Sequence, residues 1–215
     1  GIPFCIKLLL QLFRNELKTT QLAKDNLQLE FNFLKAQINP HFLFNTLNNI
    51  YGLILQGDNK KSAGLVARLS ELLRYILYES DHQTMSIESE IKLLTDYTEL
   101  EKLRLNNTFV SCTTNSDGSI NEIAPLLFMP LMENAFKYSA DKPGSVINIC
   151  LDIQNGLFLF KIKNSIEVNR SLNNPGGIGL SNFRKRLDLY YTGKYEYTVE
   201  IVEDTYIVNL LIKSS

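Results

Sequence analysis

The chain has 215 residues and a formal net charge of −1, with 45% hydrophobic and 21% charged residues. This length suits one large domain or two small ones, and the apolar content is sufficient for a packed core, which excludes a disordered chain. The 22 Lys and Arg residues nearly balance the 23 Asp and Glu residues, so the chain has no overall basic field. We therefore expect no direct binding to nucleic acid.

The cysteines and histidines are few and scattered. Cys5, Cys112 and Cys150 lie far apart, and the two histidines are His41 and His82. This spacing argues against a disulfide framework and against a structural zinc site, and it fits a reducing compartment.

The first segment, residues 1–35, reads as a helix that enters the rest of the chain. Its apolar run, residues 2–13, is interrupted by Lys7 and Gln11 and is shorter than the about 20 residues that span a bilayer. It is either the start of a helix or the cytoplasmic end of a transmembrane helix whose remainder lies outside this chain. Steps of three and four then predict a parallel two-stranded coiled coil, with a single amphipathic helix as the alternative. The seam residues are Leu10, Phe13, Leu17, Thr20, Lys24, Leu27, Phe31, Leu34 and Ile38.

Residues 36–106 predict a helical domain. Asn39-Pro40 interrupts the seam and predicts a kink or a new helix start with Asn39 as cap, because proline is favoured in a first helical turn. A turn at 57–59 separates this helix from a second, whose apolar stripe is Leu65, Leu69, Leu72 and Ile76. A third helix is expected after Ser86.

Near residue 106 the apolar period changes from 3.6 to 2, which predicts strands for residues 107–215. Asn155-Gly156 predicts a tight hairpin between strands near 147–153 and 157–162, and residues 197–202 and 206–212 predict a second hairpin. Helices are expected at 126–138 and 180–191. The fold class is therefore α+β, with helices on one face of a mixed sheet and a domain boundary at about residues 105–108.

Three segments contain residues suited to chemistry, and each also has an ordinary structural explanation. His41 follows a helix-breaking proline among apolar neighbours; neutral imidazole is a competent nucleophile, although a lone histidine there is more often part of a core. Glu133 and Lys137 share a helix face, either beside a nucleotide or as a surface ion pair. Between them, the amide oxygen of Asn134 is a hard ligand suited to Mg²⁺.

The third segment is a glycine loop, 173–180, that runs into a helix. Gly177 and Gly179 would let backbone N–H groups approach phosphate oxygens at the helix N-terminus. An ordinary loop before a helix is the alternative.

In their order and spacing, these segments together resemble the sensor histidine kinases of the LytS-like (autolysin-sensor) type. The resemblance covers roughly residue 30 to the C-terminus. The matching motifs are Gln-Ile-Asn-Pro-His-Phe-Leu-Phe-Asn (37–45), Leu-Leu-Arg-Tyr (72–75), the segments 97–104 and 125–137, Gly-Ile-Gly-Leu-Ser-Asn (177–182) and Arg186-Leu187.

The resemblance implies a dimerisation and phosphoacceptor region followed by an α/β sandwich of the gyrase, histidine kinase and MutL (GHKL) ATPase type. It implies that His41 accepts a phosphoryl group from ATP and that Asn134 binds Mg²⁺. Glu133 would orient groups around the transferred phosphoryl, and Lys137 would lie near the phosphates. Gly177 and Gly179 would close over the triphosphate, and residues 165–178 would form the ATP lid.

The implied partners are a second copy of the chain and the receiver domain of a response regulator. The implied location is the cytoplasmic side of a bacterial inner membrane, with membrane attachment only through a sensor region outside this chain.

The sequence also departs from the family pattern. Asn164 stands where the family has an adenine-reading aspartate, and no glycine follows it in the expected box; Tyr138-Ser139 replaces the usual His-Gly, and Phe42 follows the histidine where the commoner kinase class has an acid. The alternatives are a degenerate pseudokinase and a GHKL ATPase that works as a conformational clamp.

Overall fold

A computed structural model describes residues 11, 40–79, 84–167 and 178–213. The chain divides into two compact units, residues 1–43 and residues 44–215, which we describe separately. The predicted coiled coil, apart from Gln11, lies outside the described residues, as do Asn39, His82 and Gly177. Within the described ranges, no helix is long and apolar enough to cross a membrane.

The helical half contains the three helices that the sequence predicts after residue 39. Helix α2 (Pro40–Leu55) begins at the proline, and α3 (Asn59–Arg74) follows a turn in which Gly57 has φ +80°. The carboxylate of Asp58 caps α3 by accepting from the backbone N–H of Lys61 (3.2 Å). The stripe Leu65, Leu69 and Leu72 is buried, as predicted.

Helix α3 continues into a short π-helix, η1 (Tyr75–Glu79), which the sequence did not predict. Helix α4 (Ile87–Lys102) starts after Ser86, whose hydroxyl accepts from the N–H of Ser89 (3.2 Å), and it packs against α3. Because α4 also contacts strand β2 and helix α5, the helical residues from 44 onward belong to the same compact unit as the sheet. The proposed domain boundary at 105–108 falls between α4 and β2 and stays a prediction.

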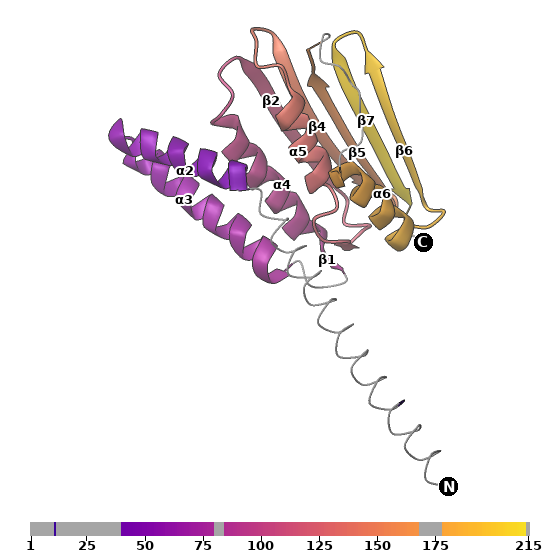
Figure 1. Cartoon of the computed structure of the whole chain (residues 1–215). Helices are drawn as coiled ribbons and strands as arrows, with labels where there is room; N and C mark the ends of the chain where they lie inside the picture. Colours follow the sequence, from indigo (N-terminus) through magenta and orange to yellow (C-terminus); the bar gives the residue numbers. More distant parts are fainter. Residues whose placement is uncertain (1–10, 12–39, 80–83, 168–177, 214–215) are drawn as a thin grey trace. The chain divides into compact units, whose positions relative to one another are not determined.

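The sheet has five strands in the order β2-β4-β5-β7-β6 (Figure 1). Only the β2–β4 pair is parallel, so the sheet is mixed, as expected. Asn155 (φ 53°) and Gly156 (φ 73°) make the predicted tight turn between β4 and β5, and Glu203 (φ 57°) turns the chain between β6 and β7. The strands are β2 (Thr108–Ser116), β4 (Ser145–Gln154), β5 (Leu157–Ser165), β6 (Tyr195–Val202) and β7 (Thr205–Lys213); β1 (Met85–Ser86) and β3 (Glu122–Ile123) form a separate pair.

The core lies between one face of the sheet and the helices α4, α5 (Met129–Tyr138) and α6 (Ile178–Tyr190), which Figure 1 shows on the same side of the sheet. Phe128 stacks on Phe158 with ring centroids 4.9 Å apart and lies 4.5 Å from Phe160. This arrangement confirms the α+β class and the coverage of one face. Helix α5 starts three residues later than expected, because Leu126 has a positive φ of 53° that a helix cannot contain.

Candidate functional site

Helix α5 presents two faces of different character. Leu131, Met132, Ala135 and Phe136 are buried against the core, and the ring of Phe136 meets Tyr97 of α4 edge to face at 5.9 Å. Asn134 and Glu133 are half-buried and Lys137 is exposed. The amphipathic pattern of this helix therefore leaves the three predicted site residues outside the core, where a ligand can reach them.

The carboxyl group of Glu133 has a pKa above the ordinary value for glutamate. Burial raises its pKa, the nearby Glu101 carboxylate raises it further, and Lys137 opposes both effects. Among the ion pairs of the described residues, none joins Glu133 to Lys137. The neighbouring Glu101 forms an ion pair with Arg104 (3.0 Å). The surface ion pair that was the alternative explanation is thus not formed.

Asn164 is the most informative residue of the site. It lies near the end of β5 with 1% of its surface exposed, and within the described part of the chain neither its amide oxygen nor its amide nitrogen has a hydrogen-bond partner. Leaving such a group unsatisfied costs about 1–3 kcal/mol, so its presence calls for a partner outside the described residues. Its amide oxygen can accept from the exocyclic amine of adenine, a donor that needs an acceptor opposite it.

Helix α6, which begins directly after Gly177, contacts α5. A Cβ added at Gly179 would lie 3.9 Å from Cβ of Pro130, so the first turns of α6 and α5 are adjacent. This is an ordinary contact distance, so packing alone does not require glycine at position 179. At the opposite end of α5, the N–H of Ala140 donates to the carbonyl of Ser165 (2.9 Å), which ties that end to Asn164 on β5.

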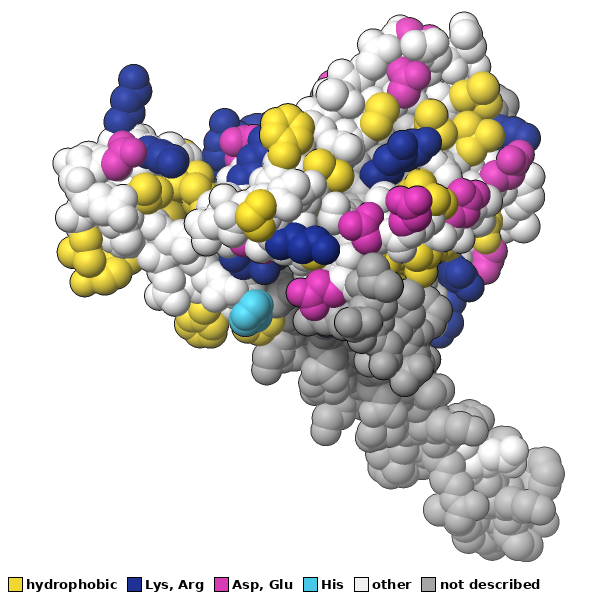
Figure 2. Space-filling model, turned by 90° about the horizontal axis from the view of Figure 1, so that it is seen from above, with side chains coloured by type: hydrophobic (Ala, Val, Ile, Leu, Met, Phe, Trp, Pro, Cys, Tyr) yellow, Lys and Arg dark blue, Asp and Glu magenta, His cyan; other side chains and the backbone are white. Residues whose placement is uncertain are grey.

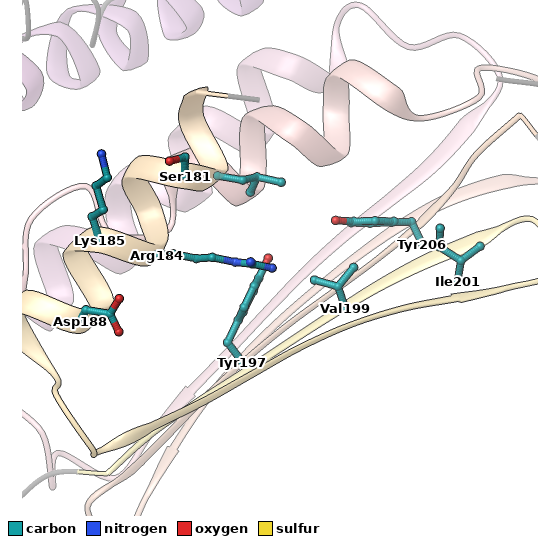
Figure 3. Close-up of a pocket in the computed structure, with 9 residues that line it drawn as sticks. Ser181, Arg184, Lys185, Asp188, Tyr197, Val199, Ile201 and Tyr206 are labelled. Carbon is teal, nitrogen blue, oxygen red and sulfur yellow. The ribbon is translucent and has the colours of Figure 1, made fainter. Parts of the chain in front are cut away.

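A cavity of about 680 Å³ lies between α6 and the β6–β7 hairpin (Figure 3). Within it, the Arg184 guanidinium lies over the Tyr197 ring at 5.4 Å, and burial is the main cause that raises the pKa of Tyr197 to about 12. Sequence reasoning missed this cavity, because only the folded chain brings α6 against the hairpin. Its described lining contains none of the predicted site residues: Leu180, Ser181, Arg184, Lys185, Asp188, Tyr197, Val199, Ile201 and Tyr206.

His41 belongs to the first compact unit. It lies in the first turn of α2, directly after Pro40, and its side chain is exposed. The position agrees with a histidine that offers its ring to another group rather than one that fills a core.

Glu133, Asn134, Lys137, Asn164 and Gly179 thus lie on three contacting elements, α5, β5 and the start of α6. Gly177 lies outside the described residues. Within the described ranges, no group of three His, Cys, Asp or Glu side chains could hold a metal ion by itself. A magnesium ion on Asn134 would therefore need further oxygen ligands from a bound substrate and from water, which is the usual arrangement for Mg²⁺.

Residues 29–109 match the family described as Histidine kinase. The chain is 26% identical over 182 residues to the sensor histidine kinase BtsS of Escherichia coli K12, which covers 83% of this chain and 32% of the relative. It is 29% identical over 190 residues to the sensor protein LytS of Staphylococcus saprophyticus, covering 81% and 32%. It is 27% identical over 197 residues to the sensor histidine kinase YesM of Bacillus subtilis, covering 84% and 33%.

The chain therefore contains a histidine kinase domain of the LytS/YesM type and is a distant homologue of these sensor histidine kinases. It spans about a third of the length of these relatives (32% of BtsS).

Solved structures similar to the chain include two histidine kinases. The catalytic domain of ThkA has a TM-score of 0.45 at 17% identity, with 61% of this chain and 95% of that chain covered. The histidine kinase domain of the blue-light activated kinase of Erythrobacter litoralis has a TM-score of 0.47 at 15% identity, with 85% and 89% covered. ThkA has also been solved in complex with the response regulator TrrA.

Proposed function

We propose that this chain is the kinase portion of a two-component sensor, which transfers the γ-phosphoryl group of ATP to His41 and then to an aspartate of a response regulator. The observation that carries the proposal is the buried amide of Asn164, which lies on a strand that contacts α5 and has no hydrogen-bond partner among the described residues. It supplies a reason for a nucleotide base to enter beside the helix that carries Asn134 and Glu133.

In this proposal, each residue has a separate task in binding ATP. Asn164 reads the adenine edge, while Lys137 and the backbone N–H groups near Gly177 and Gly179 hold the phosphates. Asn134 holds Mg²⁺, which neutralises charge on the phosphate oxygens when bound.

The transfer step needs positioning more than covalent help from the protein. The neutral ring nitrogen of His41 attacks the γ-phosphorus in line, an N–P bond forms, and the bond from the γ-phosphorus to its bridging oxygen breaks to release ADP. The second ring nitrogen then loses its proton to water. Glu133 orients groups around the transferred phosphoryl; burial and the nearby Glu101 carboxylate raise the pKa of its carboxyl group.

The proposal includes a homodimer. Besides the coiled coil expected over residues 10–38, α2 exposes a stripe at steps of three and four: Phe44, Leu47, Tyr51 and Ile54, with exposures of 65%, 46%, 61% and 49%. Hydrophobic side chains also lie open at the surface in Figure 2. An apolar stripe at this spacing suits packing against the same helix of a second copy. We further propose that a sensor region outside this chain attaches the protein to the cytoplasmic side of a bacterial inner membrane.

One observation favours a second candidate, a pseudokinase that signals by rearranging its helices. Asn164 lacks the charge of the aspartate that the LytS-like pattern has at this position, which weakens adenine binding. Incubation with γ-labelled ATP and Mg²⁺ tests the main proposal: acid-labile, alkali-stable label on the chain supports it. ATP binding without label would favour the pseudokinase.

A further inference from the structure

Glu90, in the first turn of α4, is the most deeply buried charged residue that the nucleotide site does not use. None of its surface is exposed. Its Oε2 accepts from the hydroxyl of Tyr75 (2.6 Å) and from the backbone N–H of Leu126 (3.1 Å). Its Oε1 has no hydrogen-bond partner within the described part of the chain. Burying a carboxyl group with only one of its two oxygens hydrogen-bonded within the described residues is costly, so its presence suggests a task beyond packing.

The two partners of Glu90 come from the two halves of the larger unit. Tyr75 is the residue at which α3 ends and η1 begins, and its hydroxyl also contacts the sulfur of Met85. Leu126 has a left-handed φ of 53° and lies three residues before α5, the helix with Glu133 and Asn134. One carboxylate oxygen therefore joins the end of a helix of the phosphoacceptor region to the start of the proposed nucleotide helix.

Helix α6 and Tyr191, the residue that follows it, hold the same short segment. Arg186 donates to the carbonyl of Pro125, and the hydroxyl of Tyr191 accepts from the N–H of Ala124 (2.9 Å). The segment before α5 is thus fixed by α4 and α6 together. A movement of Tyr75 that displaces Glu90 would therefore also displace this segment. The π-helix that starts at Tyr75 is a type of irregularity often found at functional sites.

We propose that Glu90 is a positioning residue that couples the end of α3 to the start of α5, so that rearrangement of the phosphoacceptor helices alters the nucleotide site and nucleotide binding alters η1. The coupling rests on the proposed function, because it assumes that α5 binds ATP. Coupling free energies are reciprocal. The change in the stability of η1 when ATP binds therefore measures how much the conformation of η1 changes the affinity for ATP.

The test uses the full 215-residue chain and hydrogen exchange of the backbone over residues 72–79, with and without a non-hydrolysable ATP analogue and Mg²⁺. Coupling of the usual size predicts about fivefold or greater slowing of exchange when the analogue binds. Tyr75→Phe, which removes one hydroxyl, should reduce this response to less than about twofold, below the usual coupling range. Its affinity for the analogue should stay close to that of the unmodified chain.

Tyr78→Phe is the matched control, because it removes a hydroxyl from the same π-helix at a residue that is 73% exposed. Its response should be unchanged. If Tyr75→Phe does not fold, Glu90→Gln replaces it; a neutral amide oxygen accepts more weakly, so the response should fall part of the way.

Three results would overturn the coupling. One is an equal response in Tyr75→Phe and Tyr78→Phe, and another is an unmodified chain that binds the analogue without any change at 72–79. In both cases the proposed kinase function stands. A chain that does not bind the analogue at all, as shown by calorimetric titration, removes the proposed function and the coupling together.

Discussion

Asn164 and Tyr206 lie directly opposite each other on the antiparallel strands β5 and β7, and Ile147 and Ile201 continue the same row across the sheet. Opposed residues of neighbouring strands face the same side, so the buried amide of Asn164 lies next to Tyr206, which lines the cavity between α6 and the β6–β7 hairpin. We expect a nucleotide base to lie against the side chains of this row.

Asn164→Asp should tighten ATP binding. A charged acceptor contributes about 1.5–3 kcal/mol to a hydrogen bond and a neutral one about 0.5–1.5, and the difference of about 1 kcal/mol corresponds to a five- to tenfold gain. Without ATP the variant should be less stable, because it buries an unpaired carboxylate. Calorimetric titration of both proteins with ATP and GTP measures the gain and the preference for adenine.

Asn209→Asp is the control for this charge change, since residue 209 lies on β7 outside the row. It should leave ATP affinity unchanged. Equal affinities in all three proteins would show that residue 164 does not face the base.

Asn134→Ala and Glu133→Gln should separate binding from catalysis. Loss of the hard amide oxygen should abolish most Mg²⁺-dependent ATP binding, whereas loss of the Glu133 charge should lower the phosphorylation rate with little effect on affinity. Nucleotide titrations with and without Mg²⁺, together with the initial rate of labelling, distinguish the two. Small and equal effects would argue for a surface role of both residues.

Glu133 should also make the stability of the chain depend on pH. Because burial and Glu101 raise its pKa in the folded state, the folded chain holds this proton at pH values where the unfolded chain has released it. Stability therefore falls as pH rises from the ordinary glutamate pKa through the raised one. Glu133→Gln should increase the melting temperature at neutral pH and lose this advantage at acidic pH, below both pKa values. An advantage that persists unchanged in acid would contradict the assignment.

Dimerisation of the chain should depend on the apolar residues of the predicted coiled coil or of the α2 stripe. Leu27→Glu with Leu34→Glu places charges at predicted buried positions of the coiled coil and should convert the dimer to monomer. If sedimentation shows an unchanged dimer, the α2 stripe becomes the expected interface. Leu47→Glu with Tyr51→Glu, at residues 46% and 61% exposed, should then dissociate it without loss of folding.

Periodicity predicted most of the fold because the elements obey local rules. The Asn155-Gly156 turn, the Ser86 cap and the stripe of α3 are all determined by neighbouring residues. The start of α5 was predicted three residues too early, because tertiary contacts of Leu126 with Glu90 override the helical pattern. The sequence did not predict η1 for the same reason: the hydroxyl of its first residue, Tyr75, donates to Glu90 of α4, which is a tertiary contact.

The candidate site was predicted only as separate segments. Spacing indicated that Glu133 and Lys137 share a face, but whether they form an ion pair depends on Glu101, which comes from α4. The lack of partners at Asn164 and the cavity under α6 arise from packing between distant strands and helices, so no local pattern predicts them.

The identity of the phosphorylated residue tests the central claim most directly. The chain and its His41→Gln variant should be incubated with γ-labelled ATP and Mg²⁺, with ATP affinity measured for both. We expect acid-labile, alkali-stable label on the unmodified chain, none on His41→Gln, equal ATP affinity, and full labelling of a His82→Gln control. Label retained by His41→Gln, or no label on a chain that binds ATP, would contradict the account.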